Sequence, residues 1–278
     1  MKTNDHDKAE LLAHLQQKAL WVRKETLRLH GLAPETRVAS SLSDVEIFVA
    51  LYYGKILKYD PQKTQWKERD RFIISKGHGS ISLYPILADV GYFDPKELDQ
   101  ICCEGSFLGG IPDTMIPGYE TINGSLGHGL GVACGMALAL KRKKSAATVF
   151  VLLGDGELYE GSVWEAVMFA AHHNLDNLVA IVDNNKTCML DRCCKILDLA
   201  SLENKFAAFN WDVTTIDGHS LEEVHDNLTR LKNTGTRPKM LIANTVKGKG
   251  VAQLENDSLC HIKSLNGEEI NAALEGLT

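Results

Sequence analysis

The sequence has no long hydrophobic run. Nowhere in its 278 residues do apolar side chains continue for the roughly 18 positions that a membrane-spanning helix needs. Residues 1–31 also lack the apolar centre of a signal peptide. A Pro/Gly/Ser-rich linker and an internal repeat are absent as well. We therefore expect a cytoplasmic protein without a membrane partner, folded as a single domain over residues 1–278.

An excess of positive charge is also missing. The formal net charge is −6 and the pI is near 5.9, which argues against nucleic acid as a partner. One short basic run, residues 141–144, stands where a helix is expected to end, and cations are favourable there.

Cysteines are present, but not in the spacing of a zinc site or a disulfide framework. The seven cysteines include the adjacent pairs Cys102–Cys103 and Cys193–Cys194 and no C-x-x-C motif. An odd number of cysteines in a chain without a secretion signal favours reduced thiols. We expect no structural metal bound by cysteine.

Hydrophobic residues make up 44% of the chain, enough for one large core, and they alternate between strand and helix patterns. Residues 148–153 and 178–182 are continuous apolar runs typical of buried parallel strands, and residues 161–173 between them have helical spacing. Further strands are expected at 71–74, 211–216 and 240–244, and further helices near 44–57, 80–90, 126–142 and 220–232. The pattern predicts an α/β fold with a mostly parallel central sheet and helices on both faces.

The amino-terminal segment predicts a helical extension that precedes this sheet. Its apolar residues form one helical stripe that ends at Gly31. We expect core packing from this stripe rather than a partner site. Its members are Leu11, Leu15, Trp21, Val22 and Leu29.

Polar residues follow two neighbouring strands of the predicted sheet. Gly154-Asp155-Gly156 comes after the first strand and Asn185 after the next. Ligands of parallel sheets bind at the carboxyl ends of the strands. A carboxylate and a carboxamide there suit Mg²⁺, which completes its coordination with phosphate oxygens and water. The alternative is an ordinary turn, which the strand on each side makes less favourable.

Gly-Asp-Gly followed by a distant Asn resembles the signature of thiamine diphosphate enzymes. More narrowly, the chain resembles the amino-terminal subunit of a split transketolase, because five segments match that family in order. They are residues 69–80, 123–135, 154–161, 183–187 and 245–250. The resemblance implies a diphosphate-binding domain that takes thiamine diphosphate and Mg²⁺, with Ca²⁺ or Mn²⁺ as substitutes.

The resemblance also implies which residues form the site. The metal ligands would be the side chains of Asp155 and Asn185 and the main-chain carbonyl of Thr187. His78 and His261 would bind the cofactor and take part in catalysis. The cofactor-binding residues implied in full are His78, Gly124, Leu126, Gly154, Asp155, Gly156, Glu157, Asn185, Thr187, Lys247 and His261.

Three of these positions can also be interpreted from the residues alone. His78 lies between two glycines after a strand, where its near-neutral pKa would serve proton relay or phosphate binding, although a solvated turn histidine is the alternative. Gly124 and Leu126 open a glycine-rich helix start that offers free amides. Close helix packing through Gly127, Gly131 and Gly135 explains the same glycines equally well.

The chain departs from the family pattern at three positions. Arg37 and Ile111 stand where the family has two active-site histidines, and His128 stands where it usually has glutamine. Arginine cannot act as a base near neutral pH but can form paired hydrogen bonds with a carboxylate or phosphate. Either the sugar differs from those of ordinary transketolases, with Arg37 as a catalytic-site residue, or activity has been lost.

The resemblance implies a transferase that moves a two-carbon ketol unit from a ketose donor to an aldehyde acceptor. The donor or acceptor would be a phosphorylated or otherwise anionic sugar, acidic or nucleotide-linked. A second chain, the C-terminal transketolase-like subunit, would supply the pyrimidine-binding domain in a two-plus-two assembly.

Two alternatives remain. One is a thiamine diphosphate ligase or lyase that uses a 2-oxo acid, against which the Lys76-Gly77-His78-Gly79 loop argues. The other is a non-catalytic cofactor-binding regulatory subunit, against which the retention of Asp155, Asn185 and His78 argues.

Overall fold

The computed structural model describes residues 5–122, 124–255 and 257–277. Its centre is a five-stranded sheet in the order β1-β2-β3-β5-β4, and every pairing is parallel. The strands are β1 (Arg71–Ile74), β2 (Val149–Gly154), β3 (Leu178–Asn184), β4 (Asp212–Asp217) and β5 (Lys239–Asn244). The mostly parallel sheet expected from the sequence is confirmed.

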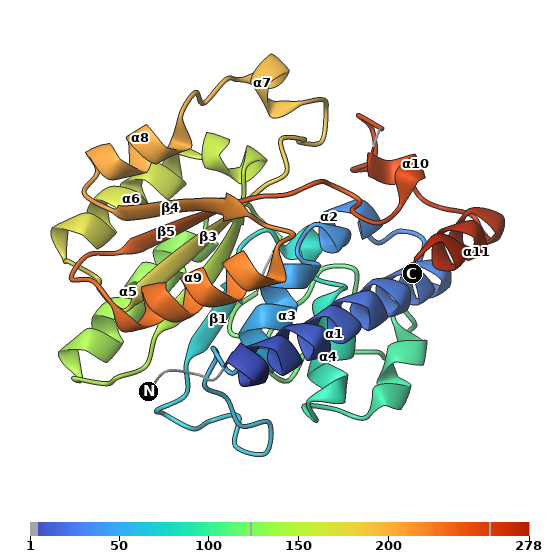
Figure 1. The fold of residues 1–278 in the computed structure, drawn as a ribbon, viewed down its shortest axis with the longest axis horizontal. Helices are drawn as coiled ribbons and strands as arrows, with labels where there is room; N and C mark the ends of the chain where they lie inside the picture. The colour runs from blue at the N-terminus through green and yellow to red at the C-terminus, as the bar shows by residue number, and fades with distance from the viewer. Residues whose placement is uncertain (1–4, 123, 256, 278) are drawn as a thin grey trace.

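Helices surround this sheet (Figure 1). The α-helices are α1 (Asp5–Leu32), α2 (Val38–Leu42), α3 (Val45–Tyr53), α4 (Leu83–Asp89), α5 (Gly129–Arg142), α6 (Gly161–His172), α7 (Cys193–Ile196), α8 (Leu202–Ala208), α9 (Leu221–Asn233), α10 (Ala252–Glu255) and α11 (Gly267–Gly276). Three short 3₁₀ helices are η1 (Gly77–Gly79), η2 (Pro95–Gln100) and η3 (Gly156–Tyr159).

Apolar side chains leave the strands alternately toward two separate core clusters. Phe150 and Leu152 of β2 pack with α1, α3, α4 and α9 on one face. Val149 and Val151 of the same strand pack with α5, α6 and α8 on the other. Successive residues of a strand point to opposite faces. The continuous apolar runs of the sequence therefore reflect burial on both faces, as expected for a parallel sheet between two helical layers.

The order of the strands explains which face each crossover helix covers. From β1 through β2 and β3 to β4 the chain advances across the sheet, and the crossover helices α5, α6 and α8 pack on one face. The chain then steps back from β4 to β5, and α9 packs on the opposite face. A right-handed crossover requires this change of face when the direction reverses.

The amino-terminal helix α1 lies on the outside of the face of the sheet that α3, α4 and α9 cover, as Figure 1 shows. Leu15, Val22 and Leu29 are completely buried in the core cluster, and Leu11 and Trp21 pack against it. The expected role of the stripe in core packing is confirmed. The helix continues one residue past Gly31, which is not in the left-handed conformation. A Cβ on Gly31 would lie 3.3 Å from Ile270 Cδ1 on α11.

The start of α5 is later than the sequence pattern suggests. The glycine-rich segment bends at Gly127, whose φ is +84°, and a Cβ at this position would lie 2.6 Å from Glu160 Cβ. Backbone in this conformation does not continue a helix and favours glycine. The helix therefore begins at Gly129. Asn123, the first residue of the matching segment, lies outside the described residues.

No helix in the described ranges is long and apolar enough to cross a membrane.

The packing of α1 makes a direct prediction about stability. Leu29→Ala deletes a completely buried side chain and should lower the free energy of unfolding by about 2–5 kcal/mol. Leu32→Ala on the same helix removes a side chain that is half exposed and should change it by less than about 0.5 kcal/mol. Urea unfolding followed by tryptophan fluorescence measures both. Equal losses would show that α1 does not pack as described.

Candidate active site

Polar segments that are distant in the sequence meet at the carboxyl ends of the strands. His78 follows β1, Asp155 follows β2, Asn185 follows β3 and Lys247 follows β5. They line one cavity of about 400 Å³. Every cofactor-binding residue implied by the sequence resemblance lines this cavity, as does Ile111. The structure therefore brings the expected set together, and their binding roles stay predictions.

Asp155 is a buried carboxylate that lacks an ion-pair partner within the described ranges. Its Oδ1 accepts a hydrogen bond from the Gly156 N–H at 2.7 Å, and its Oδ2 accepts one from the Lys186 N–H. Burial, together with the nearby charge of Asp183, raises the pKa of Asp155 to about 6. A cation at this carboxylate would offset both effects.

Asn185 and Thr187 extend the site on the β3 side. Asn185 Oδ1 accepts a hydrogen bond from the Thr187 N–H at 3.1 Å, and Asn185 Nδ2 donates to Asp183 Oδ2 at 2.7 Å. The Thr187 carbonyl, expected to bind the metal, accepts a hydrogen bond from Lys247 Nζ at 2.8 Å. Donor oxygens for a hard cation are therefore present, one of them already bonded to a lysine.

Lys247 and two histidines also line the cavity. Lys247 Nζ lies 2.9 Å from His261 Nδ1, and the His78 and His261 rings are 4.9 Å apart between centroids. Burial, then the charge of Lys247, lowers the pKa of His261 to about 3. Burial, then the charge of Lys76, lowers the pKa of both His78 and Lys247. Such mutual repulsion is relieved by an anionic ligand.

The remaining expected residues shape the cavity. Gly124 has φ +133°, a value rare for residues with a side chain. A Cβ on Gly156 would lie 3.1 Å from Cys188 Cβ, so the chain leaves little room there. The Glu157 carboxylate accepts hydrogen bonds from the Ser75 hydroxyl, the Gly127 N–H at 2.8 Å and the Gly154 N–H at 3.1 Å. Glu157 therefore also braces three segments of the wall.

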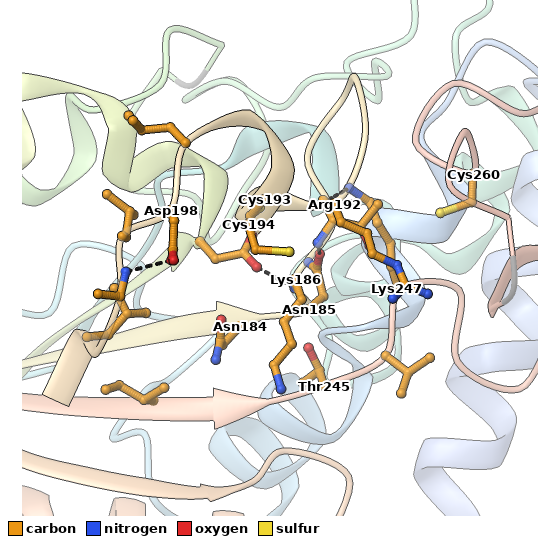
Figure 2. A pocket seen from close by; sticks show the side chains of 18 of the residues that line it. Asn184, Asn185, Lys186, Arg192, Cys193, Cys194, Asp198, Thr245, Lys247 and Cys260 are labelled. Carbon is orange, nitrogen blue, oxygen red and sulfur yellow. Dashed lines mark hydrogen bonds between the residues drawn. The ribbon is translucent and has the colours of Figure 1, made fainter.

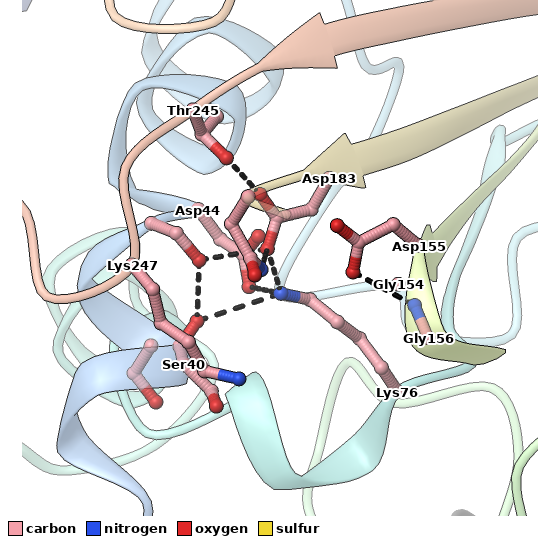
Figure 3. A network of polar contacts seen from close by, with 12 residues as sticks. Ser40, Asp44, Lys76, Gly154, Asp155, Gly156, Asp183, Thr245 and Lys247 are labelled. Atoms are coloured by element: carbon pink, nitrogen blue, oxygen red, sulfur yellow. Dashed lines mark hydrogen bonds and ion pairs between the residues drawn. The ribbon is translucent and has the colours of Figure 1, made fainter. Parts of the chain in front are cut away.

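A buried charge network beneath the cavity was not among the residues expected from the sequence (Figure 3). Lys76, 2% exposed, forms ion pairs with Asp183 and, at 2.8 Å, with Asp44. Burial opposes the charge of Lys76, but the two carboxylates raise its pKa above the usual value. Lys76 and Asp183 stand inside matching segments, and Lys76 belongs to the loop that favours the transketolase family, but no sequence signal indicated their ion pair.

Arg37 lies close enough to help lower the pKa of His261, after burial and Lys247. It directly precedes α2 and is partly exposed. The cavity wall itself does not include it. Ile111, by contrast, lines the cavity and is about half exposed.

A larger cavity of about 540 Å³ adjoins the first and shares Asp155, Asn185 and Lys247 with it. Figure 2 shows Asn185 and Lys247 on one side, with Cys193, Cys194 and Asp198 farther along the wall. Its outer carboxylates already have hydrogen-bond partners. The Asp198 carboxylate accepts from the Ala200 N–H, and the Glu203 carboxylate from the Thr215 hydroxyl, both at 2.8 Å. We place the chemistry in the smaller cavity, because its wall includes both histidines and the full set of expected cofactor-binding residues.

The cavity combines acceptor oxygens with a lysine and two histidines. Asp155 and Asn185 suit a divalent cation, and Lys247 with the two histidines suits an oxyanion. Within the described part of the chain, no cluster of three or more His, Cys, Asp or Glu side chains could hold a metal alone. A cation here would need main-chain, amide and ligand oxygens, which is usual for Mg²⁺.

Comparison with known proteins gives a consistent result. Residues 38–277 match the family described as the thiamine diphosphate binding domain of transketolase. A 6-deoxy-6-sulfo-D-fructose transketolase subunit from a Clostridium species is 39% identical over 264 residues, 95% of this chain and 96% of that protein. A subunit of the apulose-4-phosphate transketolase from Actinobacillus succinogenes is 39% identical over 265 residues, 95% of each.

Longer transketolases match over part of their length. The human transketolase is 36% identical over 255 residues, which cover 91% of this chain and 40% of that protein. The crystal structure of transketolase from Campylobacter jejuni superposes with a TM-score of 0.88 at 30% identity, covering 94% of this chain and 42% of that one. The chain thus spans about two fifths of these longer proteins.

The buried network predicts a large stability effect at Lys76. Lys76→Met leaves two buried carboxylates without their cation and should lower the free energy of unfolding by about 3–5 kcal/mol. The matched control is Lys141→Met, which breaks the partly exposed pair with Asp176 and should cost less than about 1 kcal/mol. Urea unfolding at neutral pH measures both. A Lys76→Met loss no larger than the control would contradict the network described.

Proposed function

The chain belongs to the transketolase family through its thiamine diphosphate-binding domain, and we propose that it is one subunit of a two-chain enzyme. The reaction is transfer of a two-carbon ketol unit from a ketose donor to an aldehyde acceptor. The observation that carries this proposal is the pairing of Asp155 and Asn185 with Lys247, His78 and His261 around one cavity.

The residues present fit thiamine diphosphate with Mg²⁺. Asp155 is a buried carboxylate whose raised pKa a cation would lower, and an anion would raise the depressed pKa values of Lys247 and His78. Asp155, Asn185 and the Thr187 carbonyl would hold the cation, and Lys247 would neutralise charge on the diphosphate, to which the histidines could donate hydrogen bonds. When bound, thiamine diphosphate supplies the carbon nucleophile and the electron sink.

Both histidine rings are neutral in this site and could take part in proton transfer. While Lys247 is an ammonium it can only donate, so His261 Nδ1 accepts and the ring proton resides on Nε2. The lowered pKa of His78 also keeps that ring neutral at pH 7. A neutral imidazole can donate at one nitrogen and accept at the other, which suits transfer of a proton to and from a sugar hydroxyl.

The substrate in this proposal is an anionic sugar that differs from ordinary pentose phosphates. Ile111 brings an apolar side chain to the cavity, and Arg37 brings a permanent positive charge to the neighbourhood of His261. Two relatives are named for 6-deoxy-6-sulfo-D-fructose and for apulose 4-phosphate. Both names denote sugars with an acidic group, which a guanidinium can bind through paired hydrogen bonds.

The proposal includes a C-terminal partner chain, in a two-plus-two cytoplasmic assembly. Exposed apolar side chains gather on segments that also line the cavity; they include Met115, Ile122, Met189, Leu190, Leu259 and Ile262. Exposed apolar groups in such number typically mark an interface. The relatives of equal length are named as subunits, and the match covers only 40% of the human transketolase, so most of that longer protein has no counterpart in this chain.

The function is tested by turnover of the chain mixed with its partner subunit, thiamine diphosphate and Mg²⁺. We expect ketol transfer in the mixture and none from this chain alone. Asp155→Ala should abolish cofactor binding, measured by calorimetry, while the urea unfolding transition is retained. Asp198→Ala, in the adjoining cavity, is the matched control and should bind normally. Full turnover by the chain alone, or normal binding by Asp155→Ala, would refute the proposal.

Substrate choice is tested at Arg37. Arg37→Ala should raise the KM for an anionic sugar about tenfold or more with a smaller change in kcat, because a charge-assisted hydrogen bond is worth roughly 1.5–3 kcal/mol. Arg192→Ala, in the adjoining cavity, is the control. Steady-state kinetics with sulfonated, phosphorylated and neutral sugars provide the measurement. Unchanged kinetics for every substrate, together with efficient use of pentose phosphates, would show that Arg37 has no such role.

A further inference from the structure

The Asn185 carboxamide has two ends of nearly equal shape and opposite function. Its oxygen can bind a cation, whereas its NH₂ group can only donate hydrogen bonds. A site that uses Asn185 as a ligand must therefore fix which end faces the cation. Nothing in the Asn185 side chain itself provides this preference, so it has to come from a neighbouring group.

Asp183 is that neighbour. Its Oδ2 accepts a hydrogen bond from the Asn185 NH₂ group at 2.7 Å. Because an ionised carboxylate can only accept hydrogen bonds, the amide oxygen of Asn185 cannot form this contact. The Asn185 oxygen is thereby turned to the other side, where it accepts the Thr187 N–H at 3.1 Å. Both ends of the amide are thus assigned by a partner that permits one orientation.

The Asp183 carboxylate is itself held in one orientation. It is completely buried and accepts further hydrogen bonds from Lys76, from the Ser43 hydroxyl at 2.7 Å and from the Thr245 hydroxyl. These donors come from three other segments, and Figure 3 shows Lys76 and Thr245 approaching the carboxylate from different directions. Any rotation of the carboxylate would break a buried hydrogen bond, which is costly.

We propose that Asp183 is a positioning residue that orients the Asn185 carboxamide so that its oxygen faces the cation. This inference rests on the proposed metal site. Groups that hold metal ligands in place typically contribute 10–100-fold to metal affinity. Asp183→Asn should weaken the preference, because an amide at position 183 can pair with either end of the Asn185 amide and only the Thr187 N–H still selects the oxygen.

The test compares the same substitution in two backgrounds. The probe is Mn²⁺, titrated in the presence of thiamine diphosphate into the chain assembled with its partner subunit. In the natural background, Asp183→Asn should weaken Mn²⁺ binding by about 10–100-fold. In an Asn185→Asp background, both side-chain oxygens at position 185 can bind the cation and no wrong end exists. There Asp183→Asn should change the affinity by less than about twofold, or improve it.

Ser43→Ala is the matched control, because it removes a different hydrogen bond to the same carboxylate and leaves the Asn185 contact in place. It should retain Mn²⁺ affinity even if it lowers stability, which urea unfolding reports separately for every variant. An equal loss of affinity in both backgrounds would mean that Asp183 is only structural and would overturn the inference. So would an unchanged affinity in the natural background. If Asp155→Ala also leaves Mn²⁺ binding unchanged, the metal site of the proposed function fails, and the inference fails with it.

Discussion

The buried contact between Lys76 and Asp183 is the interaction on which the rest of the site depends. Lys76 leads into the segment of His78, and Asp183 leads into the segment of Asn185 and Thr187. Thr245, hydrogen-bonded to Asp183, leads into the segment of Lys247. Segments after three different strands are therefore joined through one carboxylate. An ion pair so deeply buried adds little net stability compared with an apolar packing, but losing one partner is expensive.

The parallel sheet is the second feature that brings these segments together. Because every strand runs in the same direction, each one delivers its following loop to the same edge. Polar interactions help to hold these loops in position. The buried network provides such interactions next to the cavity, since Lys76 also lines its wall.

The sequence predicted the sheet, its major helices and the grouping of the expected site residues at one edge. Continuous apolar runs such as those of β2 and β3 are strong signals because both faces are buried. The short helices α2, α7, α8 and α10 were not predicted, since one or two turns carry too little periodicity, and the ten-residue helix α11 was missed as well.

The roles of Asp44 and Thr245 were missed for a different reason. Their partners, Lys76 and Asp183, are brought to them only by the tertiary fold. Glu157 was expected to face the cofactor, and no sequence pattern indicated that its carboxylate also joins Ser75 to Gly127. The late start of α5 came from a backbone bend at Gly127, which helical periodicity does not report.

The hydrogen bond from Lys247 to the Thr187 carbonyl couples the two kinds of ligand. In the proposed site, a divalent cation at this oxygen would meet an ammonium already bonded to it, and the two positive charges would repel each other. An anion that drew the lysine toward itself would remove this repulsion. Phosphate and cation would then bind cooperatively, and linkage would require the gain in affinity to be equal in both directions. If the proposed cation binds there, Lys247 occupies beforehand the position of a positive charge that the cation would take over.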